Sequence, residues 1–152
     1  MRCTVQHPTP RHKRITARYT RFGRKDAELG AQQPDEAGKS FEALCGAGDL
    51  DGLMSLYEPD AVFTNKRGAH VGSEAIRYVL QGYLDTGASI TMNESVVFEV
   101  GNLALVHWSW TMRFPDGRTA EGATAEVLRK QADGSWKFVI DNPDGPALIN
   151  HT

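Results

Sequence analysis

Residues 103–114, Leu-Ala-Leu-Val-His-Trp-Ser-Trp-Thr-Met-Arg-Phe, alternate between two kinds of side chain. One set is Val106, Trp108, Trp110, Met112 and Phe114, and the other is Leu105, His107, Ser109, Thr111 and Arg113. A period of two predicts a β-strand with one face against an apolar core. The strand is long, so the sheet that contains it must twist and curve.

Similar alternation on both sides of this stretch predicts a sheet of four long strands. We expect strands at about 90–100, 103–114, 118–131 and 135–142, joined by the turn sequences Gly101-Asn102, Pro115-Asp116-Gly117 and Asp133-Gly134. Such short connections force neighbouring strands to pair antiparallel.

Helical periodicity is confined to the part of the chain before residue 90. Helices are expected from Pro34 to about residue 45, from the Asp49 cap through Tyr57, and over residues 73–86, with a small hairpin at 61–64 and 69–71 between the last two. Helices followed by a strand meander indicate an α+β fold with the helices on one face of the sheet.

The turns also predict the register of the sheet. A three-residue loop at 115–117 places Trp110 opposite Gly122, Trp108 opposite Thr124 and Val106 opposite Glu126, so that large rings face small partners. For the last hairpin the apolar pattern requires a three-residue loop, which keeps Trp136, Phe138 and Ile140 on the face of Leu128.

Glu126 is the acid that this register places among apolar side chains. A carboxyl group on a covered face must find a partner or keep its proton, and a protonated acid can donate a hydrogen bond to a substrate oxygen. Two structural alternatives stay open: Glu126 pairs with an arginine or a backbone amide, or it lies at a strand end that is exposed to solvent. We take Glu126 as the candidate catalytic acid/base.

Other polar residues are expected to have structural roles. A bulge at Val96-Val97 would turn Glu94 outward, and Asp141 is expected on the outer face with Lys137 and Val139. His107 is assigned to the same outer face. Trp108 and Trp110 are expected in the core, where they would also wall an apolar pocket.

Length and composition exclude several classes of protein. The chain has 152 residues, 40% of them hydrophobic and 24% charged, as in one ordinary globular domain. No apolar stretch is long enough to cross a membrane, and no zinc spacing, P-loop or dinucleotide fingerprint occurs. Cys3 and Cys45 cannot form a disulfide framework, so a cytoplasmic protein without a metal or other cofactor is expected.

The first 25 residues differ from the rest in charge. They contain eight basic residues and no acid, whereas residues 26–152 have nine basic residues against nineteen acids. Residues 1–32 are predicted to be a basic, disordered tail, 33–146 the folded domain, and 147–152 a C-terminal tail. The basic tail could contact a phosphate-rich partner or be a targeting peptide, but a solvated extension is favoured. The acidic folded domain argues against nucleic-acid binding.

Three phrases and their order resemble the nuclear transport factor 2-like superfamily, in its SnoaL-like and ketosteroid isomerase-like branches. The phrases are Ala47-Gly48-Asp49-Leu50-Asp51-Gly52, Leu56-Tyr57-Glu58-Pro59-Asp60-Ala61-Val62-Phe63 and Val71-Gly72-Ser73-Glu74-Ala75-Ile76. The ending Glu126-Val127-Leu128-Arg129 with Asp133-Gly134-Ser135-Trp136 is similar too. The resemblance implies a cone, also called a cystatin-like fold, in which a curved antiparallel sheet wraps three N-terminal helices, with a pocket at the open end and a dimer interface on the exposed sheet face.

The catalytic residues of steroid isomerases carry over only in part. The resemblance places their helical tyrosine at Phe41, their catalytic base at Asn65 and their protonated acid at Glu126, and Tyr57 resembles a supporting tyrosine. Because Phe41 lacks a hydroxyl and an amide such as Asn65 cannot act as a base, the usual steroid isomerase mechanism is not expected.

Two functions from different classes remain. The first is a homodimeric domain that binds a small apolar molecule in a pocket formed by Phe41, Tyr57, Asn65, His70, Trp108 and Trp110, with proton-transfer isomerase or lyase chemistry at Glu126. The second is a non-catalytic association module that dimerises through the sheet face of His107, Ser109, Thr111, Arg113 and Val127. An open cavity that reaches Glu126 favours the first function, and a cavity filled by side chains favours the second.

Overall fold

The computed structural model describes residues 16–21 and 31–145, which form eight strands, three α-helices and one short 3-10 helix. In chain order these are β1 (Thr16–Arg21), η1 (Pro34–Glu36), α1 (Ala37–Ala47), α2 (Leu50–Ser55), β2 (Tyr57–Asn65), β3 (Gly68–Val71), α3 (Gly72–Asp85), β4 (Ser89–Val100), β5 (Leu103–Arg113), β6 (Thr119–Ala123), β7 (Glu126–Lys130) and β8 (Trp136–Asp141). No helix among these residues is long and apolar enough to cross a bilayer.

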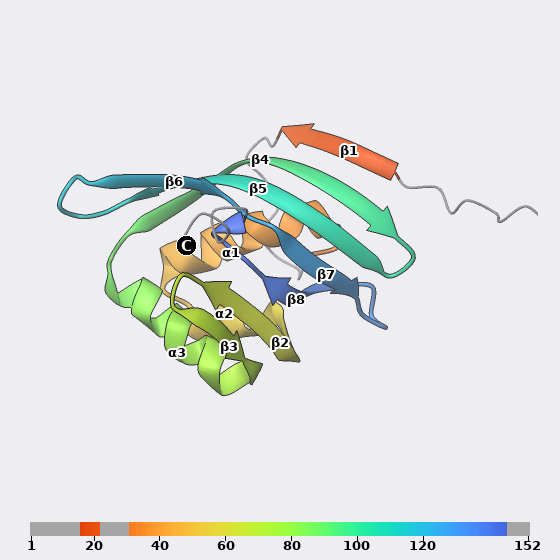
Figure 1. Ribbon diagram of the computed structural model, residues 1–152, viewed down its shortest axis with the longest axis horizontal. Helices are drawn as coiled ribbons and strands as arrows, with labels where there is room; N and C mark the ends of the chain where they lie inside the picture. Colours follow the sequence, from red (N-terminus) through yellow and green to blue (C-terminus); the bar gives the residue numbers. More distant parts are fainter. Residues whose placement is uncertain (1–15, 22–30, 146–152) are drawn as a thin grey trace, which may run out of the picture.

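The strands form one curved sheet in the order β1-β4-β5-β7-β8-β2-β3, with β6 also paired to β5 (Figure 1). The α+β cone is therefore confirmed. The sheet is mixed rather than wholly antiparallel, because β2 pairs with β8 in the parallel sense. These two strands are far apart in the sequence, so no tight turn forces them into an antiparallel pair.

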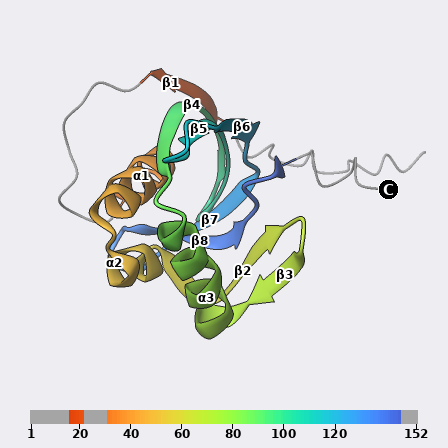
Figure 2. The same ribbon diagram turned by 90° about the vertical axis from the view of Figure 1, so that its left-hand side faces the viewer.

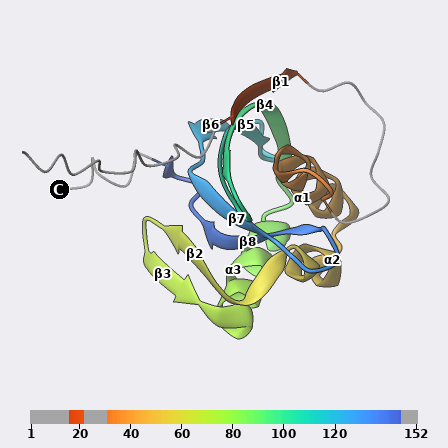
Figure 3. The ribbon, with the colours of Figure 1, turned by 90° about the vertical axis from the view of Figure 1, so that its right-hand side faces the viewer.

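All three helices lie inside the curl of the sheet. Helix α1 packs against β4, whereas α3 packs against β2 and α2. Figure 2 shows β4 and β5 arching over α1, with α3 below, and Figure 3 shows the same curl from the opposite side. The enclosed space between the long strands and the helices is where the site described below is found.

Residues 16–21 are not the disordered segment that the sequence predicted. They form β1, which pairs antiparallel with β4 from Thr16 opposite Glu99 to Arg21 opposite Glu94. The edge of β4 offers unpaired N–H and C=O groups to any extended segment that can reach it. Residues 1–15 and 22–30 of this expected tail lie outside the described parts. The folded domain begins before the expected residue 33, because Ala31 is buried and its carbonyl accepts the Trp136 N–H at 2.8 Å.

The predicted register of the central strands is confirmed. Trp110 pairs with Gly122, and Val106 pairs with Glu126. Thr124 N–H donates to the Trp108 carbonyl at 2.8 Å, while the Thr124 hydroxyl oxygen accepts the Trp108 N–H at 3.0 Å. The pairing ladder is interrupted at Thr124 and Ala125, which divides the single strand expected at 118–131 into β6 and β7. Glu126 is therefore the first residue of β7, on the inner face.

A bulge in β8 overturns the predicted side for Asp141. Leu128 pairs with Phe138, as expected, but Val127 pairs with Ile140, so Val139 is an extra residue in β8. An extra residue inverts the alternation beyond it. Ile140 is consequently 40% exposed, whereas Asp141 is buried on the inner face.

Glu94 does point outward, but the bulge responsible lies earlier than expected. The shift in pairing falls between Met92 and Ser95 rather than at Val96-Val97. Glu94 is exposed, and the inward positions after the bulge are Ser95 and Val97.

Tyr57 lies in a strand and not in the second helix. Helix α2 is capped by Asp49, whose carboxylate accepts the Gly52 N–H at 2.8 Å, and it ends at Ser55. Tyr57 is the first residue of β2 and pairs with Phe138 of β8. This change of element directs the Tyr57 side chain into the interior, where it is 4% exposed.

Candidate functional site

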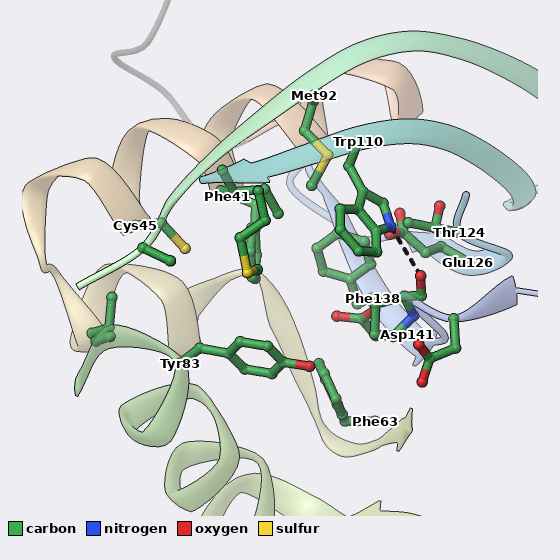
Figure 4. A pocket seen from close by; sticks show the side chains of 16 residues that line it. Phe41, Cys45, Phe63, Tyr83, Met92, Trp110, Thr124, Glu126, Phe138 and Asp141 are labelled. Carbon is green, nitrogen blue, oxygen red and sulfur yellow. Dashed lines mark hydrogen bonds between the residues drawn. The ribbon is translucent and has the colours of Figure 1, made fainter. Parts of the chain in front are cut away.

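A cavity of about 140 Å³ lies between the helices and the inner face of the sheet. Its apolar wall consists of five aromatic rings and three sulfur-containing side chains, drawn in Figure 4: Phe41, Phe63, Tyr83, Trp110 and Phe138, with Cys45, Met92 and Met112. An apolar cavity of about 150 Å³ holds a molecule the size of benzene. The cavity therefore has room for a small ring or a short branched chain.

Glu126 reaches this cavity from the start of β7. Its side chain is 3% exposed, and Oε2 has no hydrogen-bond partner. Burial, reinforced by the nearby charge of Asp141, raises the pKa of the Glu126 carboxyl well above its usual value, and a hydrogen bond from Thr124 only partly opposes this rise. Burial therefore favours the protonated form of Glu126.

Asp141 is a second buried acid that lines the cavity, and its side chain contacts Tyr57. The Tyr57 hydroxyl donates a hydrogen bond to Oδ2 of Asp141. Burial raises the pKa of Asp141 to about 6, and the Tyr57 hydrogen bond limits that rise. The two carboxyl groups thus differ, because burial favours the protonated form of Glu126, whereas Asp141, with a pKa of about 6, is mostly ionised at neutral pH.

The two phenols and the thiol near this pair are poor acids. Burial and the charge of Asp141 raise the pKa of Tyr57 well above its usual value and that of Cys45 to about 12. Burial, followed by the charges of Asp144 and Asp141, raises the pKa of Tyr83. The hydroxyls can donate hydrogen bonds, but neither they nor the Cys45 thiol will ionise near neutral pH.

The cavity brings together only some of the residues that the sequence singled out. Glu126, Phe41 and Trp110 line it, and the Trp110 indole N–H donates to the Pro143 carbonyl at 2.9 Å. Trp108 is fully buried in the core and does not line the cavity. Tyr57 acts through its hydrogen bond to Asp141 instead of lining the cavity itself.

Asn65 and His70 lie in a different place. They line a more open groove between the β2–β3 hairpin and α3, together with Lys66, Arg67 and Tyr78. The Asn65 Oδ1 accepts the Arg67 N–H at 2.8 Å and so shapes the hairpin turn. Tyr83 and Asp144 line both the groove and the cavity, which makes the two spaces neighbours.

Sequence reasoning missed Asp141 and Tyr83. Strict alternation assigned Asp141 to the outer face, and nothing in the local sequence marks Val139 as a bulge residue. Tyr83 falls in the helix expected over residues 73–86, and no pattern in the sequence predicts which part of the sheet its ring contacts. Its ring lies 6.0 Å from that of Phe63, between centroids, and closes one side of the cavity.

The family model of the SnoaL-like domain matches residues 38–139, which is most of the cone. The chain belongs to the SnoaL-like domain family. None of the curated proteins compared with it matches.

This SnoaL-like domain also resembles solved structures at low sequence identity. An NTF2-like protein of unknown function from Pseudomonas putida KT2440 has a TM-score of 0.63 and 17% identity, covering 70% of this chain and 80% of that one. A Xanthomonas campestris protein whose name refers to the association domain of calcium/calmodulin-dependent protein kinase II gives 0.60 and 16%, covering 78% and 94%. A ketosteroid isomerase-like protein from Erwinia carotovora atroseptica gives 0.54 and 22%, covering 70% and 88%. At these identities the likeness concerns the fold alone.

Proposed function

We propose that the cavity binds a small, largely apolar molecule, and that Glu126 is its acid/base group. The observation that carries this proposal is a buried carboxyl that faces an apolar cavity and whose Oε2 has no hydrogen-bond partner among the described residues. A buried polar atom without a partner is costly, and a ligand that supplies the missing hydrogen bond removes that cost.

Proton transfer is the chemistry that Glu126 supports. In an isomerisation, Glu126 would give its proton to one ligand atom and recover a proton from another, so that the carboxyl ends as it began. In a dehydration, it would protonate the departing hydroxyl, which leaves as water when the C–O bond breaks, and the Glu126 carboxylate would then take the proton from the adjacent carbon as the C=C bond forms. The domain is not a standard ketosteroid isomerase, since Phe41 and Asn65 stand at the positions of the tyrosine and the base. A cytoplasmic location remains a prediction, consistent with a free Cys45 thiol.

Acetophenone and ethylbenzene form a matched pair of probes for this proposal. We expect acetophenone to bind at least about tenfold more tightly, because only its carbonyl can accept a hydrogen bond from Glu126. NMR of ¹³C-labelled methionine methyls locates the binding: Met92 and Met112, which line the cavity, should shift on titration, and Met54, which does not, should stay constant.

Glu126→Leu should abolish the preference for acetophenone, and Glu121→Gln, a change at an exposed glutamate on β6, should leave it intact. Methyl signals of Met92 and Met112 that never move with either probe would refute ligand binding in the cavity. An unchanged preference in Glu126→Leu would remove Glu126 from the site.

We propose in addition that the outer face of the sheet forms a homodimer, the association role expected from the sequence. The observation that favours it is an apolar patch on this face, comprising Phe98, Val100, Leu103, Leu105 and Ile140, each 37–45% exposed. A shallow depression within it is lined by four of these residues, Phe98, Val100, Leu103 and Leu105, together with Glu99, Ala104 and Val127. Contiguous exposed apolar surface of this kind is typical of interfaces between subunits.

Leu105→Glu should weaken the dimer at least about tenfold, because it places a charge at the centre of the patch. Analytical ultracentrifugation over a range of concentrations measures the effect. Val71→Glu is the matched control, since Val71 is 64% exposed on β3, away from this face. A wild-type chain that stays monomeric at high concentration would contradict the dimer.

A further inference from the structure

Asp141 has no part in the proton transfer proposed for Glu126, and yet it is a buried, mostly ionised carboxylate that lines the same cavity. Its one neutral donor partner is the Tyr57 hydroxyl. A buried charge is unfavourable unless an opposite charge or several hydrogen bonds compensate it. None of the described residues that line the cavity supplies an opposite charge.

The charged side chains that line the cavity, within the described residues, are all acidic: Glu126, Asp141 and Asp144. Glu126 and Asp141 are buried, whereas Asp144 is half-buried and also lines the neighbouring groove, so Asp141 is the buried carboxylate that remains when Glu126 keeps its proton. Lys66 and Arg67 are exposed and line the neighbouring groove, not the cavity. Of the two, Arg67 acts on the cavity wall, where its charge partly opposes the rise in the pKa of Tyr83.

The rest of the wall suits a cation as well. Five aromatic rings surround the space beside the two carboxyl groups (Figure 4). The face of an aromatic ring attracts a nearby cation, most strongly when water is excluded. A wall of aromatic rings around a single carboxylate can therefore hold an ammonium group and the apolar body to which it is attached.

We propose that the cavity selects small apolar amines, whose ammonium group pairs with Asp141 while Oε2 of Glu126 accepts a second N–H; this inference rests on the proposed function of the cavity as a ligand site. One bound cation makes the deep end of the cavity neutral. A neutral alcohol leaves Asp141 uncompensated, and a carboxylate ligand adds a second negative charge in a medium of low dielectric constant.

Benzylamine, benzyl alcohol and benzoate test this selectivity, since they share one ring and differ in charge. We expect benzylamine to bind at least about tenfold more tightly than benzyl alcohol near pH 7.5, and benzoate not to bind detectably. Calorimetry gives the affinities, and the Met92 and Met112 methyl signals show that the ligand is in the cavity.

Asp141→Asn should reduce benzylamine to about the affinity of benzyl alcohol, because the amide keeps the shape but not the charge. Asp116→Asn, at an exposed hairpin turn, is the control and should change neither affinity. If benzyl alcohol binds as tightly as benzylamine, the amine selectivity is refuted and the ligand site stands. If no probe shifts the two methyl signals, the amine proposal and the ligand site both fail.

A second measurement does not depend on the folding of Asp141→Asn. The groups that face Asp141 are Tyr57 from β2, Glu126 from β7, Cys45 from α1 and Tyr83 from α3. The pKa of Asp141 is raised to about 6, whereas burial raises that of Cys45 to about 12 and those of Tyr57, Tyr83 and Glu126 above their usual values. Benzylamine affinity in the wild type should fall about tenfold for each pH unit below that value, while benzyl alcohol affinity stays nearly constant. Parallel pH profiles for the two probes would overturn the pairing with Asp141.

Discussion

Gly38→Val should lower the free energy of unfolding by about 3 kcal/mol or more, because the new side chain would occupy the space of the Trp108 ring. A Cβ on Gly38 would lie 2.8 Å from Cδ2 and Cζ2 of Trp108, and closer still to Cε2. Trp108 is fully buried in β5 and Gly38 is buried at the start of α1, so neither can move aside without disturbing the core. Urea denaturation measures the loss.

Gly82→Ala is the matched control for this change. Gly82 also lies within a helix, α3, but a Cβ there would meet nothing within 4 Å. It should therefore gain about 0.5–1 kcal/mol from the better helix propensity of alanine. Combining Gly38→Val with Trp108→Leu should recover part of the lost stability, since the smaller side chain leaves room. Additive losses in the double variant would show that the two residues do not compete for the same space.

The stability of the wild type should fall as the pH rises from about 4 to 7, relative to the variants Glu126→Gln and Asp141→Asn. For a carboxyl whose pKa is raised by folding, the folded chain holds a proton that the unfolded chain has lost. Each pH unit between the unfolded and the folded pKa then costs about 1.4 kcal/mol. For Asp141, which moves from 3.8 to about 6, the loss amounts to about 3 kcal/mol.

Thermal or urea unfolding at several pH values measures this difference. Asp116 and Asp133 act in the opposite direction, because hydrogen bonds from Arg118 and Ser135 lower their pKa values, but both residues are present in every variant and cancel in the comparison. Each variant curve should diverge upward from the wild type as the pH rises. If the variant and wild-type curves of stability against pH run parallel over the whole range, folding does not raise the pKa of either carboxyl.

Regular alternation made much of the fold predictable. Val106, Trp108 and Trp110 lie at every second position, and short turns on both sides of their strand leave little choice of pairing. The sequence alone therefore predicted Glu126 on the inner face, and the register of the sheet confirms it. The helices were located for a similar reason, because Asp49 and Gly87 lie at their boundaries. The family resemblance and these local patterns agreed about the cone.

Irregular backbone set the limit of that reasoning. The bulges at Val139 and at Asn93-Glu94 each invert the strand beyond them. The out-of-pattern Glu94 indicated the second bulge but not its position, and nothing in the local sequence indicated the first. This is why Asp141, half of the candidate site, was assigned to the wrong face. The resemblance placed Asn65 at the position of the catalytic base, and His70 was expected as a polar contact of the pocket, but both residues line the neighbouring groove beside the β2–β3 hairpin.

The protonation state of Glu126 is the claim on which the site depends, and a ¹³C NMR titration of its side-chain carboxyl carbon measures it directly. The signal is assigned by its loss in Glu126→Gln. We predict a midpoint well above the ordinary glutamate value of about 4.3, with the carboxyl still protonated at neutral pH. A midpoint at the ordinary value would mean that water reaches this carboxyl freely, and would contradict the buried acid on which the proposed function is built.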